Sequence, residues 1–378
     1  MSQRRLLIVT TTAETLATIL REQPRYLAEH FQVAVSCARD GHYAVLESDL
    51  EIPVFPVAMA RGISPWRDLR SIFAMLRVMR AFKPDIVHSY TPKAGLVAMS
   101  AAWLLRVPAR VHTFTGLIFP SASGFKRRLL IAVDRLIARL ATRAIPESEG
   151  VKRDLLAHRI TRRPQPVIGH GNIAGVDTVL FDADRPEVAG PAATLRRTTL
   201  AGAAFTFCYV GRINRDKGLT ELADAFQTLP DNAALLLVGE LDTTAPPAGD
   251  ALARLKADPR VHFAGFQRDV RPFIAASDAL VLPSYREGFP NVVLQALSLS
   301  RPVIVTDVSG ANEIAVAGEN GWIVPVGDAD ALHRAMQHAL DSDAGDIQKM
   351  GRSGRSRVAA RHERALYLQH LRDFYDSL

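Results

Sequence analysis

Short apolar runs alternate with longer stretches of helical periodicity along most of the chain. Between the runs, apolar residues recur every three to four positions, as at Leu69, Ile72, Phe73, Leu76 and Met79, which predicts a helix over 69–82. The strand-like runs of the first half cover residues 6–10, 33–37, 54–57, 85–90, 110–113 and 144–146. Those of the second half cover 205–210, 233–238, 261–263, 279–283, 302–305 and 321–324. Apolar strands that alternate with helices indicate parallel sheets covered on both faces, so we expect two doubly wound α/β domains in series.

The pattern is interrupted near the middle of the chain. Residues 182–200 contain Pro186, Gly190 and Pro191 and show little periodicity, as domain linkers often do. The expected order is an N-terminal domain, a linker, a C-terminal domain and a final helix that packs back toward the first domain, over residues 1–183, 184–200, 201–361 and 362–378.

Composition and charge narrow the class of protein. The chain has 378 residues, of which 48% are hydrophobic and 22% charged, which is ordinary for a folded protein and excludes a largely disordered one. Residues 1–180 hold 25 Lys and Arg against 14 Asp and Glu, whereas the rest hold 21 against 25. A basic first half is suited to nucleic acid, an anionic membrane surface or a phosphorylated substrate, and the charge alone does not choose among them.

Cellular location is indicated by the cysteines and the apolar runs. Cys37 and Cys208 lie in strand-like runs, which predicts buried, reduced thiols in a cytoplasmic protein. The run at 6–9 is too short for a secretory signal, and the longest apolar run, 96–105, falls short of the roughly 18 residues of a membrane span.

One basic motif follows the first strand of the second half. A strand ends at Gly211 and Arg212, and Lys217 with Gly218 opens the next helix. Two cations at a helix N-terminus favour a diphosphate, because the helix dipole and free N–H groups add to their charge. The alternative is a solvated basic turn.

A second motif follows the strand over 279–283. Glu287 and Gln295 are eight residues apart, with a turn of Gly288, Phe289 and Pro290 between them and a helix starting near Asn291. A carboxylate and an amide suit sugar and ribose hydroxyls, while the N–H groups of Asn291 and Val292 suit a phosphate. The alternative is a surface Glu and a buried, satisfied Gln.

These motifs, in this order and at this spacing, resemble the donor site of family 4 glycosyltransferases. The resemblance covers essentially the whole chain and is strongest in the second half. The matching segments are Gly211-Arg212 with Lys217-Gly218, Gly265-Phe266 before a polar loop that starts at Gln267, Glu287-Gly-Phe-Pro290, Arg301 to Asp307, Gly310 with Glu313, and Asn320-Gly321. It implies the GT-B architecture, in which two Rossmann-like domains face each other with the active site in the cleft between them.

The resemblance also implies roles for single residues. In the family, a Glu at the position of Glu287 contacts the donor sugar and a second Glu holds the ribose hydroxyls. This chain departs from the pattern, since the second Glu is Gln295, which we expect to weaken or alter donor binding rather than abolish activity. The implied nucleotide-sugar contacts are Gly211, Arg212, Lys217, Phe266, Gln267, Glu287, Gly288, Phe289, Pro290, Asn291, Val292 and Gln295.

In the first half, the segment Lys83-Pro-Asp-Ile-Val-His88-Ser-Tyr-Thr-Pro-Lys93-Ala-Gly95 resembles members of the family that extend lipid-linked oligosaccharides of bacterial surface polysaccharides. His112 ends a strand where relatives place a His near the donor sugar, and the alternative is a strand-end His bonded to backbone. The Gly-rich loop that many members carry after the first strand is replaced here by Thr10-Thr-Thr-Ala-Glu14. The expected catalytic residues are His112, Arg212, Lys217 and Glu287, and the expected acceptor-side residues are Thr11, Thr12, His88, Lys93 and Gly116.

The segment 125–143 predicts a basic amphipathic helix. It combines apolar residues at helical spacing with Lys126, Arg127, Arg128 and three further arginines, a pattern that can lie on an anionic bilayer. The alternative is a helix whose apolar side packs on the sheet while its arginines lie in solvent.

Several other sites are disfavoured. Asp-x-Asp pairs at 182–184, 328–330 and 341–343 lie in the linker or at helix starts, where Asp is a common cap, so we expect no metal site there. The chain has no Cys and His at zinc spacing, no Gly-x-Gly-x-x-Gly motif for a nicotinamide cofactor and no nucleic-acid-binding motif.

Together these features predict a metal-independent, retaining glycosyltransferase without a cofactor. Its donor would be a UDP-sugar and its acceptor a polyprenyl-diphosphate-linked saccharide, at the anionic inner face of the cytoplasmic membrane. Retention, donor and acceptor are implied by the family resemblance. The alternatives are a nucleotide-sugar epimerase on the same fold and a non-catalytic membrane- or nucleic-acid-binding relative.

Overall fold

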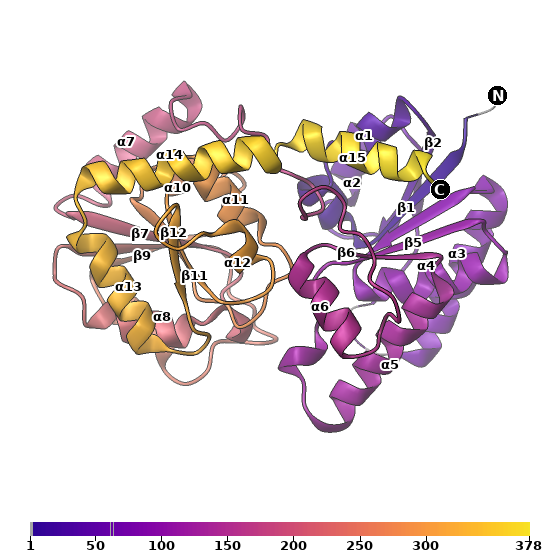
Figure 1. The fold of residues 1–378 in the computed structure, drawn as a ribbon, viewed down its shortest axis with the longest axis horizontal. Coiled ribbons are helices and arrows are strands. Elements are labelled where there is room, and N and C mark those ends of the chain that lie inside the picture. The colour runs from indigo at the N-terminus through magenta and orange to yellow at the C-terminus, as the bar shows by residue number, and fades with distance from the viewer. Residues whose placement is uncertain (1–2, 61, 63) are drawn as a thin grey trace. The chain divides into compact units, whose positions relative to one another are not determined.

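The chain divides into two units (Figure 1). The computed structural model describes residues 3–60, 62 and 64–378. The first unit comprises Met1–Ala174 and Tyr367–Leu378, and the second comprises Gly175–Leu366. From Tyr367 on, the last helix of the chain therefore belongs to the unit that contains the first strand.

The first unit is built on a six-stranded parallel sheet in the order β3-β2-β1-β4-β5-β6. Its strands are β1 Arg5–Thr12, β2 Gln32–Ala38, β3 Val54–Pro56, β4 Ile86–Tyr90, β5 Ala109–Phe114 and β6 Arg143–Pro146. Its helices are α1 Gln23–Ala28, α2 Tyr43–Asp49, α3 Pro65–Phe82, α4 Pro92–Leu104, α5 Gly124–Leu140, α6 Glu149–Ala157 and α15 Arg364–Asp376, with short turns at Thr15–Ile19 and Phe119–Ser121.

Two apolar cores lie on the two faces of this sheet. One core contains Met75 of α3, Val97 of α4 and Ile137 of α5. The other contains Leu46 of α2 and Leu371 of α15, together with residues of α1. The helices α3, α4 and α5 thus cover one face, and α1, α2 and α15 the other, as β-branched strands that are buried on both sides require.

The second unit repeats this plan with a parallel sheet in the order β12-β11-β10-β7-β8-β9. Its strands are β7 Phe205–Val210, β8 Ala233–Val238, β9 Val261–Gly265, β10 Ala279–Leu282, β11 Val303–Thr306 and β12 Gly321–Val324. Its helices are α7 Pro186–Thr198, α8 Leu219–Gln227, α9 Ala251–Ala257, α10 Arg271–Ala275, α11 Asn291–Ser298, α12 Ala311–Ile314, α13 Ala329–Asp341 and α14 Ala344–Arg361, with a 3-10 turn at Arg215–Lys217.

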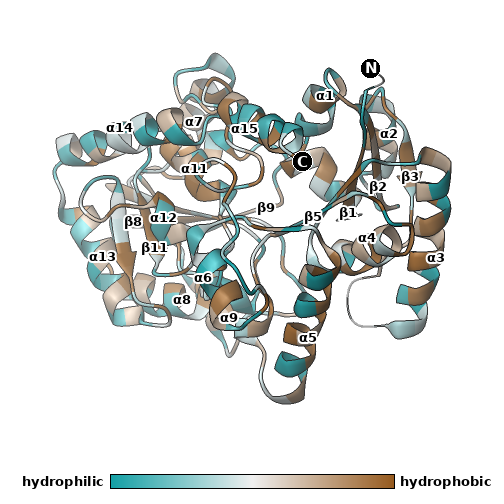
Figure 2. Ribbon diagram, turned by 45° about the vertical axis from the view of Figure 1, so that its right-hand side comes forward, coloured by the Kyte–Doolittle hydropathy of each residue, from teal (hydrophilic) through white to brown (hydrophobic). Residues whose placement is uncertain are grey.

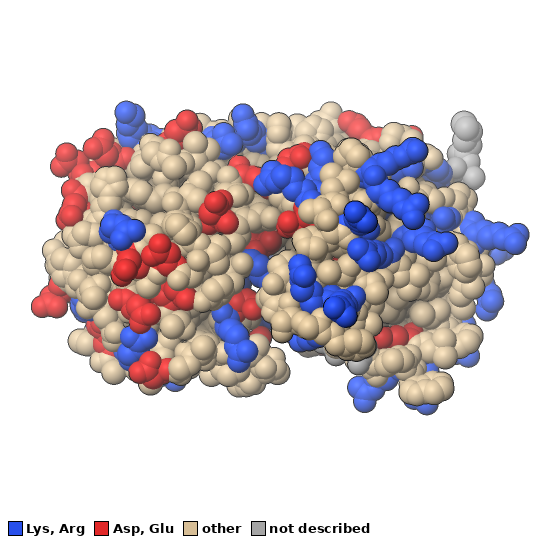
Figure 3. Space-filling view, turned by 60° about the horizontal axis from the view of Figure 1, so that its bottom comes forward, with Lys and Arg blue, Asp and Glu red and all other residues tan. Residues whose placement is uncertain are grey.

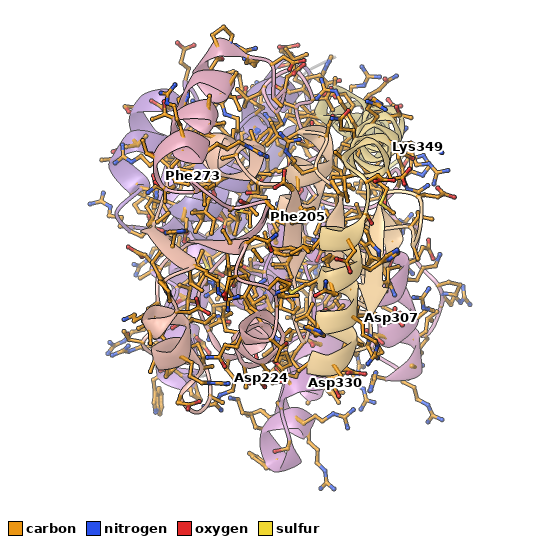
Figure 4. The ribbon with its side chains drawn as sticks, turned by 90° about the vertical axis from the view of Figure 1, so that its left-hand side faces the viewer. Phe205, Asp224, Phe273, Asp307, Asp330 and Lys349 are labelled. Atoms are coloured by element: carbon orange, nitrogen blue, oxygen red, sulfur yellow. The ribbon has the colours of Figure 1, made fainter. Side chains whose placement is uncertain are left out.

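The sheet of the second unit is also covered on both faces (Figure 4). Figure 4 shows β7 at Phe205 in the middle of the unit, with α8 and α13 below it at Asp224 and Asp330. Above it lie α10 at Phe273 and α14 at Lys349. A single large apolar core joins the sheet to both helix layers.

The predicted α/β class and all twelve predicted strands are confirmed. The prediction of an irregular linker over residues 184–200 is wrong. Most of residues 184–200 form the helix α7. Pro186 is compatible with this helix because it occupies the first turn, where proline is tolerated. Val188 and Ala192, one turn apart, are buried in the core of the second unit. Pro191 lies inside the helix and has no N–H to donate to the carbonyl of Glu187, so α7 lacks one backbone hydrogen bond there.

The helix predicted over 69–82 is present as α3, but two of its apolar residues do not face the core. Leu76 and Met79 are buried, as expected. Leu69 and Phe73 are instead 44% and 56% exposed. The periodicity predicted the helix correctly, but it grouped two exposed residues with the buried ones.

The two cysteines are free and buried, as predicted. Burial raises the pKa of each thiol to about 12, so both are inert at neutral pH. Among the residues that the structure describes, no helix is both long enough and apolar enough to span a bilayer.

Candidate donor site

The loop after β7 is held tightly against the end of β10. Gly218, the N-cap residue directly before α8, has φ of +66°, in the left-handed region that favours glycine. A Cβ atom at this position would lie 1.9 Å from the carbonyl oxygen of Pro283. The glycine therefore permits a close approach that places Lys217 beside the loop that carries Glu287.

The two loops are joined by a ladder of polar contacts. Lys217 Nζ donates a hydrogen bond to Glu287 Oε1 at 2.5 Å, and these side chains are 20% and 12% exposed. The neighbouring Arg286 donates two hydrogen bonds to Asp216 Oδ2, at 3.0 and 2.6 Å. Adjacent residues on each loop thus form two ion pairs of opposite polarity, which fix the position of one loop against the other.

A third contact extends the ladder. The backbone N–H of Tyr285 donates to the carbonyl of Asp216 at 2.8 Å, and the Tyr285 hydroxyl donates to Glu221 of α8.

The sequence predicted that Lys217 and Glu287 lie in one site, but it did not predict the pair of Asp216 and Arg286. Their signal in the sequence is that each is directly next to a candidate residue and carries the opposite charge.

The turn after Glu287 is packed against the start of α12. Gly310 has φ of +77°, and a Cβ atom there would lie 2.0 Å from the carbonyl oxygen of Gly288. The N–H of Gly310 donates to Glu313 Oε1 at 3.3 Å. The segment from Gly310 to Glu313 therefore lies against the turn after Glu287, a contact that the sequence alone did not predict.

Helix α11 begins at Asn291, where the sequence predicted a helix start. Phe289 before it is buried, with its ring 5.3 Å from that of His362. Gln295 lies in the second turn and is half-buried. Within the part of the chain that the structure describes, its side-chain amide has no hydrogen-bond partner, unlike the satisfied buried amide of the alternative interpretation.

Two expected donor residues lie nearer to solvent. The Arg212 side chain is 65% exposed, with Nη1 3.7 Å from Asp242 Oδ2. Phe266, after β9, is 56% exposed, and Gln267 donates to the carbonyl of Ala264 at 2.7 Å. Arg212 is thus free to turn toward an anion at modest cost, since so long and exposed an ion pair contributes little stability.

His112 lies in β5 of the first unit and is fully buried. Its Nδ1 is 2.9 Å from Ser89 Oγ, while its Nε2 has no hydrogen-bond partner among the described residues. A Cβ atom on Gly95 of α4 would lie 2.4 Å from the imidazole Cε1, so the glycine makes room for the ring. Burial lowers the His112 pKa to about 3, which leaves the imidazole neutral at neutral pH.

His88 is a core residue and not the acceptor-side residue that the sequence predicted. It has no exposed area, its Nδ1 is 2.5 Å from the Tyr375 hydroxyl, and its Nε2 is 2.7 Å from Thr113 Oγ1. Burial also holds its pKa well below the usual range. Both ring nitrogens therefore connect β4 to its neighbours, including α15.

The other expected acceptor-side residues lie near the carboxyl ends of β1, β4 and β5. Thr11 Oγ1 is 2.6 Å from Thr91 Oγ1, and Thr12 Oγ1 is 3.2 Å from Thr15 Oγ1. Gly116 follows β5 with φ of +78°. Lys93, in the first turn of α4, forms a 2.6 Å ion pair with Asp68 of α3, in which the two side chains are 13% and 11% exposed.

The Asp-x-Asp pairs have structural partners. Asp328 Oδ1 accepts from the N–H of Ala331 at 2.8 Å and so caps α13. Asp182 Oδ2 accepts from Arg355 at 2.7 Å. In the described ranges, no three His, Cys, Asp or Glu side chains are grouped in a way that could hold a metal ion.

Comparison with known families supports the interpretation of these motifs. The family described as "Glycosyl transferases group 1" matches residues 204–342, and the family described as "Glycosyl transferase 4-like domain" matches residues 14–171. The chain belongs to the family 4 glycosyltransferases. The two matches fall in the two units, so each sheet of this glycosyltransferase corresponds to one domain of the family.

Curated relatives of this glycosyltransferase include enzymes named for capsular polysaccharide biosynthesis and for transfer to a diphosphoundecaprenol-linked sugar. The capsular polysaccharide biosynthesis glycosyltransferase CapM of Staphylococcus aureus is 30% identical over 325 residues, which are 85% of this chain and 84% of the relative. The UDP-Gal:alpha-D-GlcNAc-diphosphoundecaprenol alpha-1,3-galactosyltransferase of Escherichia coli is 23% identical, over 92% of this chain and 89% of the relative.

Solved structures place the glycosyltransferase in the GT-B fold. Anabaena Alr3699/HepE in complex with UDP and glucose has a TM-score of 0.83 at 20% identity, covering 99% of this chain and all of the other. The lipopolysaccharide glycosyltransferase WaaG has a TM-score of 0.70 at 16% identity, covering 96% and 98%. The predicted GT-B architecture is confirmed.

Proposed function

We propose that this bacterial polysaccharide glycosyltransferase moves a hexose or N-acetylhexosamine from a UDP-sugar to a polyprenyl-diphosphate-linked saccharide, with retention at the anomeric carbon. The observation that carries the proposal is the contact between Lys217 and Glu287 at the start of α8, with Arg212 on the same loop. Support for donor and acceptor comes from the name of the Escherichia coli relative, and the UDP complex of HepE supports the nucleotide.

The proposed chemistry is stabilisation of a leaving group. As the bond to the sugar breaks, the departing diphosphate gains negative charge, and preorganised cations lower the energy of that state. In the proposal Lys217 exchanges Glu287 for the diphosphate, and Arg212 turns in from solvent. Glu287, released from Lys217, then accepts hydrogen bonds from the sugar hydroxyls.

The remaining donor contacts follow from α11 and the loop after β9. We place the nucleotide near Phe266 and Gln267, a phosphate at the first turn of α11, and the ribose at Gln295. His112 of the first unit enters the proposal on the family resemblance alone, as a neutral imidazole whose Nε2 has no hydrogen-bond partner among the described residues. No metal and no cofactor takes part in the proposed reaction.

The proposed site of action is the inner face of the cytoplasmic membrane, where a polyprenyl-linked acceptor resides. The basic first half of the sequence supports attraction to anionic lipid. Part of this positive charge lies on α5, which carries Lys126, Arg127 and Arg128 in its first turns, all exposed.

Substitution of the two cations tests the proposal. Arg212→Ala and Lys217→Ala should each lower kcat about a hundredfold, the usual effect of removing one electrostatic group from a transition state. Lys256→Ala is the matched control, because Lys256 is an exposed cation of the same unit on α9. Near-normal turnover in both site variants would contradict the assigned roles, as would loss of activity in EDTA that Mn²⁺ restores.

A further inference from the structure

Helix α3 exposes a row of large apolar side chains. Trp66, Leu69 and Phe73 are 80%, 44% and 56% exposed. Their spacing of three and four residues places them on one side of the helix. The buried residues Met75 and Met79 lie on the opposite side, in the core with α4 and α5. The exposed row is therefore additional to the packing that holds α3 on its sheet.

Arginines share this side of the helix. Arg70 and Arg77 lie one turn beyond Trp66 and Phe73, and both are exposed, as is Arg80. The acidic residue of α3, Asp68, is turned inward and paired with Lys93. The exposed side of α3 over residues 66–80, here called the α3 face, thus combines aromatic and cationic groups without a carboxylate.

Helix α5, the segment with the amphipathic sequence, presents less apolar surface. Ile137 is buried in the same core as Met75, and Leu130 and Val133 pack against that core. Only Phe125 and Leu136, at 80% and 43%, are exposed among its large apolar residues. Figure 2 shows hydrophobic and hydrophilic positions alternating along both α3 and α5. The apolar side of α5 is thus largely used in folding, whereas that of α3 is divided between the core and the surface.

The α3 face begins at the carboxyl edge of the first sheet. The ion pair between Asp68 and Lys93 joins the first turns of α3 and α4. Helix α4 follows β4 directly, so these first turns lie at the carboxyl edge of the parallel sheet, where α/β proteins bind ligands. Figure 3 shows Lys and Arg gathered on one face of the first unit, while the second unit shows a mixture of charges.

We propose that the α3 face is a docking surface for an anionic lipid bilayer, with Trp66 and Phe73 inserted at the headgroup level and Arg70 and Arg77 on the lipid phosphates. Aromatic rings favour this level of a membrane, and juxtaposed arginines are attracted to anionic headgroups. This docking surface goes beyond the proposed function, because it assigns membrane contact to α3. The contact does not depend on glycosyl transfer.

The tryptophans allow a direct test in the full chain. The sequence has three of them, Trp66, Trp103 and Trp322. Trp103, 53% exposed at the end of α4 far from its first turn, is a matched control. One variant keeps only Trp66 (W103F/W322F), and another keeps only Trp103 (W66F/W322F). With phosphatidylglycerol vesicles, Trp66 emission should shift to shorter wavelength and be quenched by brominated lipid, and Trp103 emission should not change.

Binding measurements complete the test. Cosedimentation with the same vesicles should weaken roughly tenfold in Trp66→Ser/Phe73→Ser, because two inserted side chains are lost. Arg70→Gln/Arg77→Gln should weaken binding to phosphatidylglycerol vesicles and leave binding to phosphatidylcholine vesicles unchanged. Thermal melts of each variant show whether the fold is retained, and neither readout depends on activity.

Other outcomes would overturn the proposal. They are equal responses of Trp66 and Trp103, no binding to phosphatidylglycerol vesicles at all, or loss of binding on neutralising Lys126, Arg127 and Arg128 of α5 with no effect of the α3 substitutions. A Trp66 shift that depends on protein concentration without vesicles would instead assign the α3 face to a second copy of the chain.

Discussion

Lys217 and Glu287 are 70 positions apart in sequence, yet their side chains neutralise each other at the start of α8. Beside them, Asp216 and Arg286 form a second pair of reversed polarity. The inner pair can exchange partners when a diphosphate and a sugar arrive, while the outer pair keeps the two loops together. In the proposed site, these two ion pairs hold the loops together before a donor arrives.

Gln295 stands where the family resemblance implies a second Glu, and this difference gives a specific prediction. If it holds the ribose hydroxyls, Gln295→Ala should raise the donor KM with little change in kcat, because ribose contacts differ little between ground and transition states. Gln295→Glu should keep or improve affinity, since hydrogen bonds to a charged acceptor are about twice as strong as neutral ones.

Two measurements distinguish this role from a structural one. They are the UDP affinity and the melting temperature of both variants. Unchanged UDP affinity in Gln295→Ala, combined with a lower melting temperature in Gln295→Glu, would show that the amide serves packing alone and that an unpaired carboxylate is costly there.

The sequence predicted the positions of some of these residues and missed the contacts of others, for physical reasons. Lys217, Glu287 and the helix start at Asn291 stand next to strand ends, and parallel strands bring such positions to one edge of a sheet. His88 also stands in a strand, but its partner Tyr375 is 287 residues away, so its burial could not be inferred from its neighbours. Asp216 and Arg286 were missed because an ion pair between loops has no local periodicity.

Among the helices, α5 carries a buried acidic side chain, Asp134, on its inward side. Asp134 is 6% exposed, and burial raises the pKa of its carboxyl to about 7. Because the folded state holds this proton more tightly than the unfolded state, Asp134 favours folding at low pH. That contribution is complete below about pH 4 and is lost as the pH rises through 7.

Asp134→Asn should remove this pH dependence. Urea unfolding at pH 5 and pH 8 should show the variant gaining stability relative to wild type as the pH rises, with an upper limit of about 1.4 kcal/mol for each pKa unit crossed. A difference between the two proteins that stays constant from pH 5 to pH 8 would mean that the carboxyl titrates as if it were in water.

Helical periodicity predicted that α3 and α5 are helices, but it did not predict which of their apolar residues are exposed. Both have apolar residues at helical spacing, and both pack on the same face of the first sheet. How much of an apolar stripe is covered depends on the neighbouring helices, which periodicity does not describe. Trp66 and Phe73 on α3 therefore remain exposed, while Ile137 on α5 is buried.

At the scale of the whole molecule, the first unit is completed by the end of the chain. Tyr367, Leu371 and Tyr375 of α15 are buried in the core that also contains Leu6 and Ile8 of β1. The hydroxyl of Tyr375 contacts His88, and Arg4 donates to the Tyr375 carbonyl at 2.7 Å. The twelve strands could be predicted because each carries its own apolar run, but α7 could not, since its two prolines and Gly190 resemble a linker.

Truncating one side chain of α15 should destabilise the first unit. Leu371 has no exposed area, and Leu371→Ala should cost about 2–5 kcal/mol, the usual effect of a cavity at a buried leucine. Urea unfolding followed by single tryptophans separates the units, because Trp66 and Trp103 report on the first and Trp322 on the second.

The midpoint reported by Trp66 and Trp103 should fall in Leu371→Ala, and that reported by Trp322 should not. Leu332→Ala is the matched control, since Leu332 of α13 is 1% exposed in the core of the second unit and should show the reverse pattern. Equal shifts of all three tryptophans in Leu371→Ala would mean that the two units unfold as one.

Nucleotide release shows whether the protein transfers sugar from a UDP-sugar to a lipid-linked acceptor. Wild type and Lys217→Ala are incubated with UDP-, GDP- and ADP-sugars, with and without a lipid extract of bacterial membranes, and free nucleotide and sugar products are followed. We predict UDP release that requires the extract, places the sugar in the lipid fraction and falls about a hundredfold in Lys217→Ala. Isomerised sugar without nucleotide release would identify an epimerase instead, and no turnover of any donor would rule out the proposed transfer.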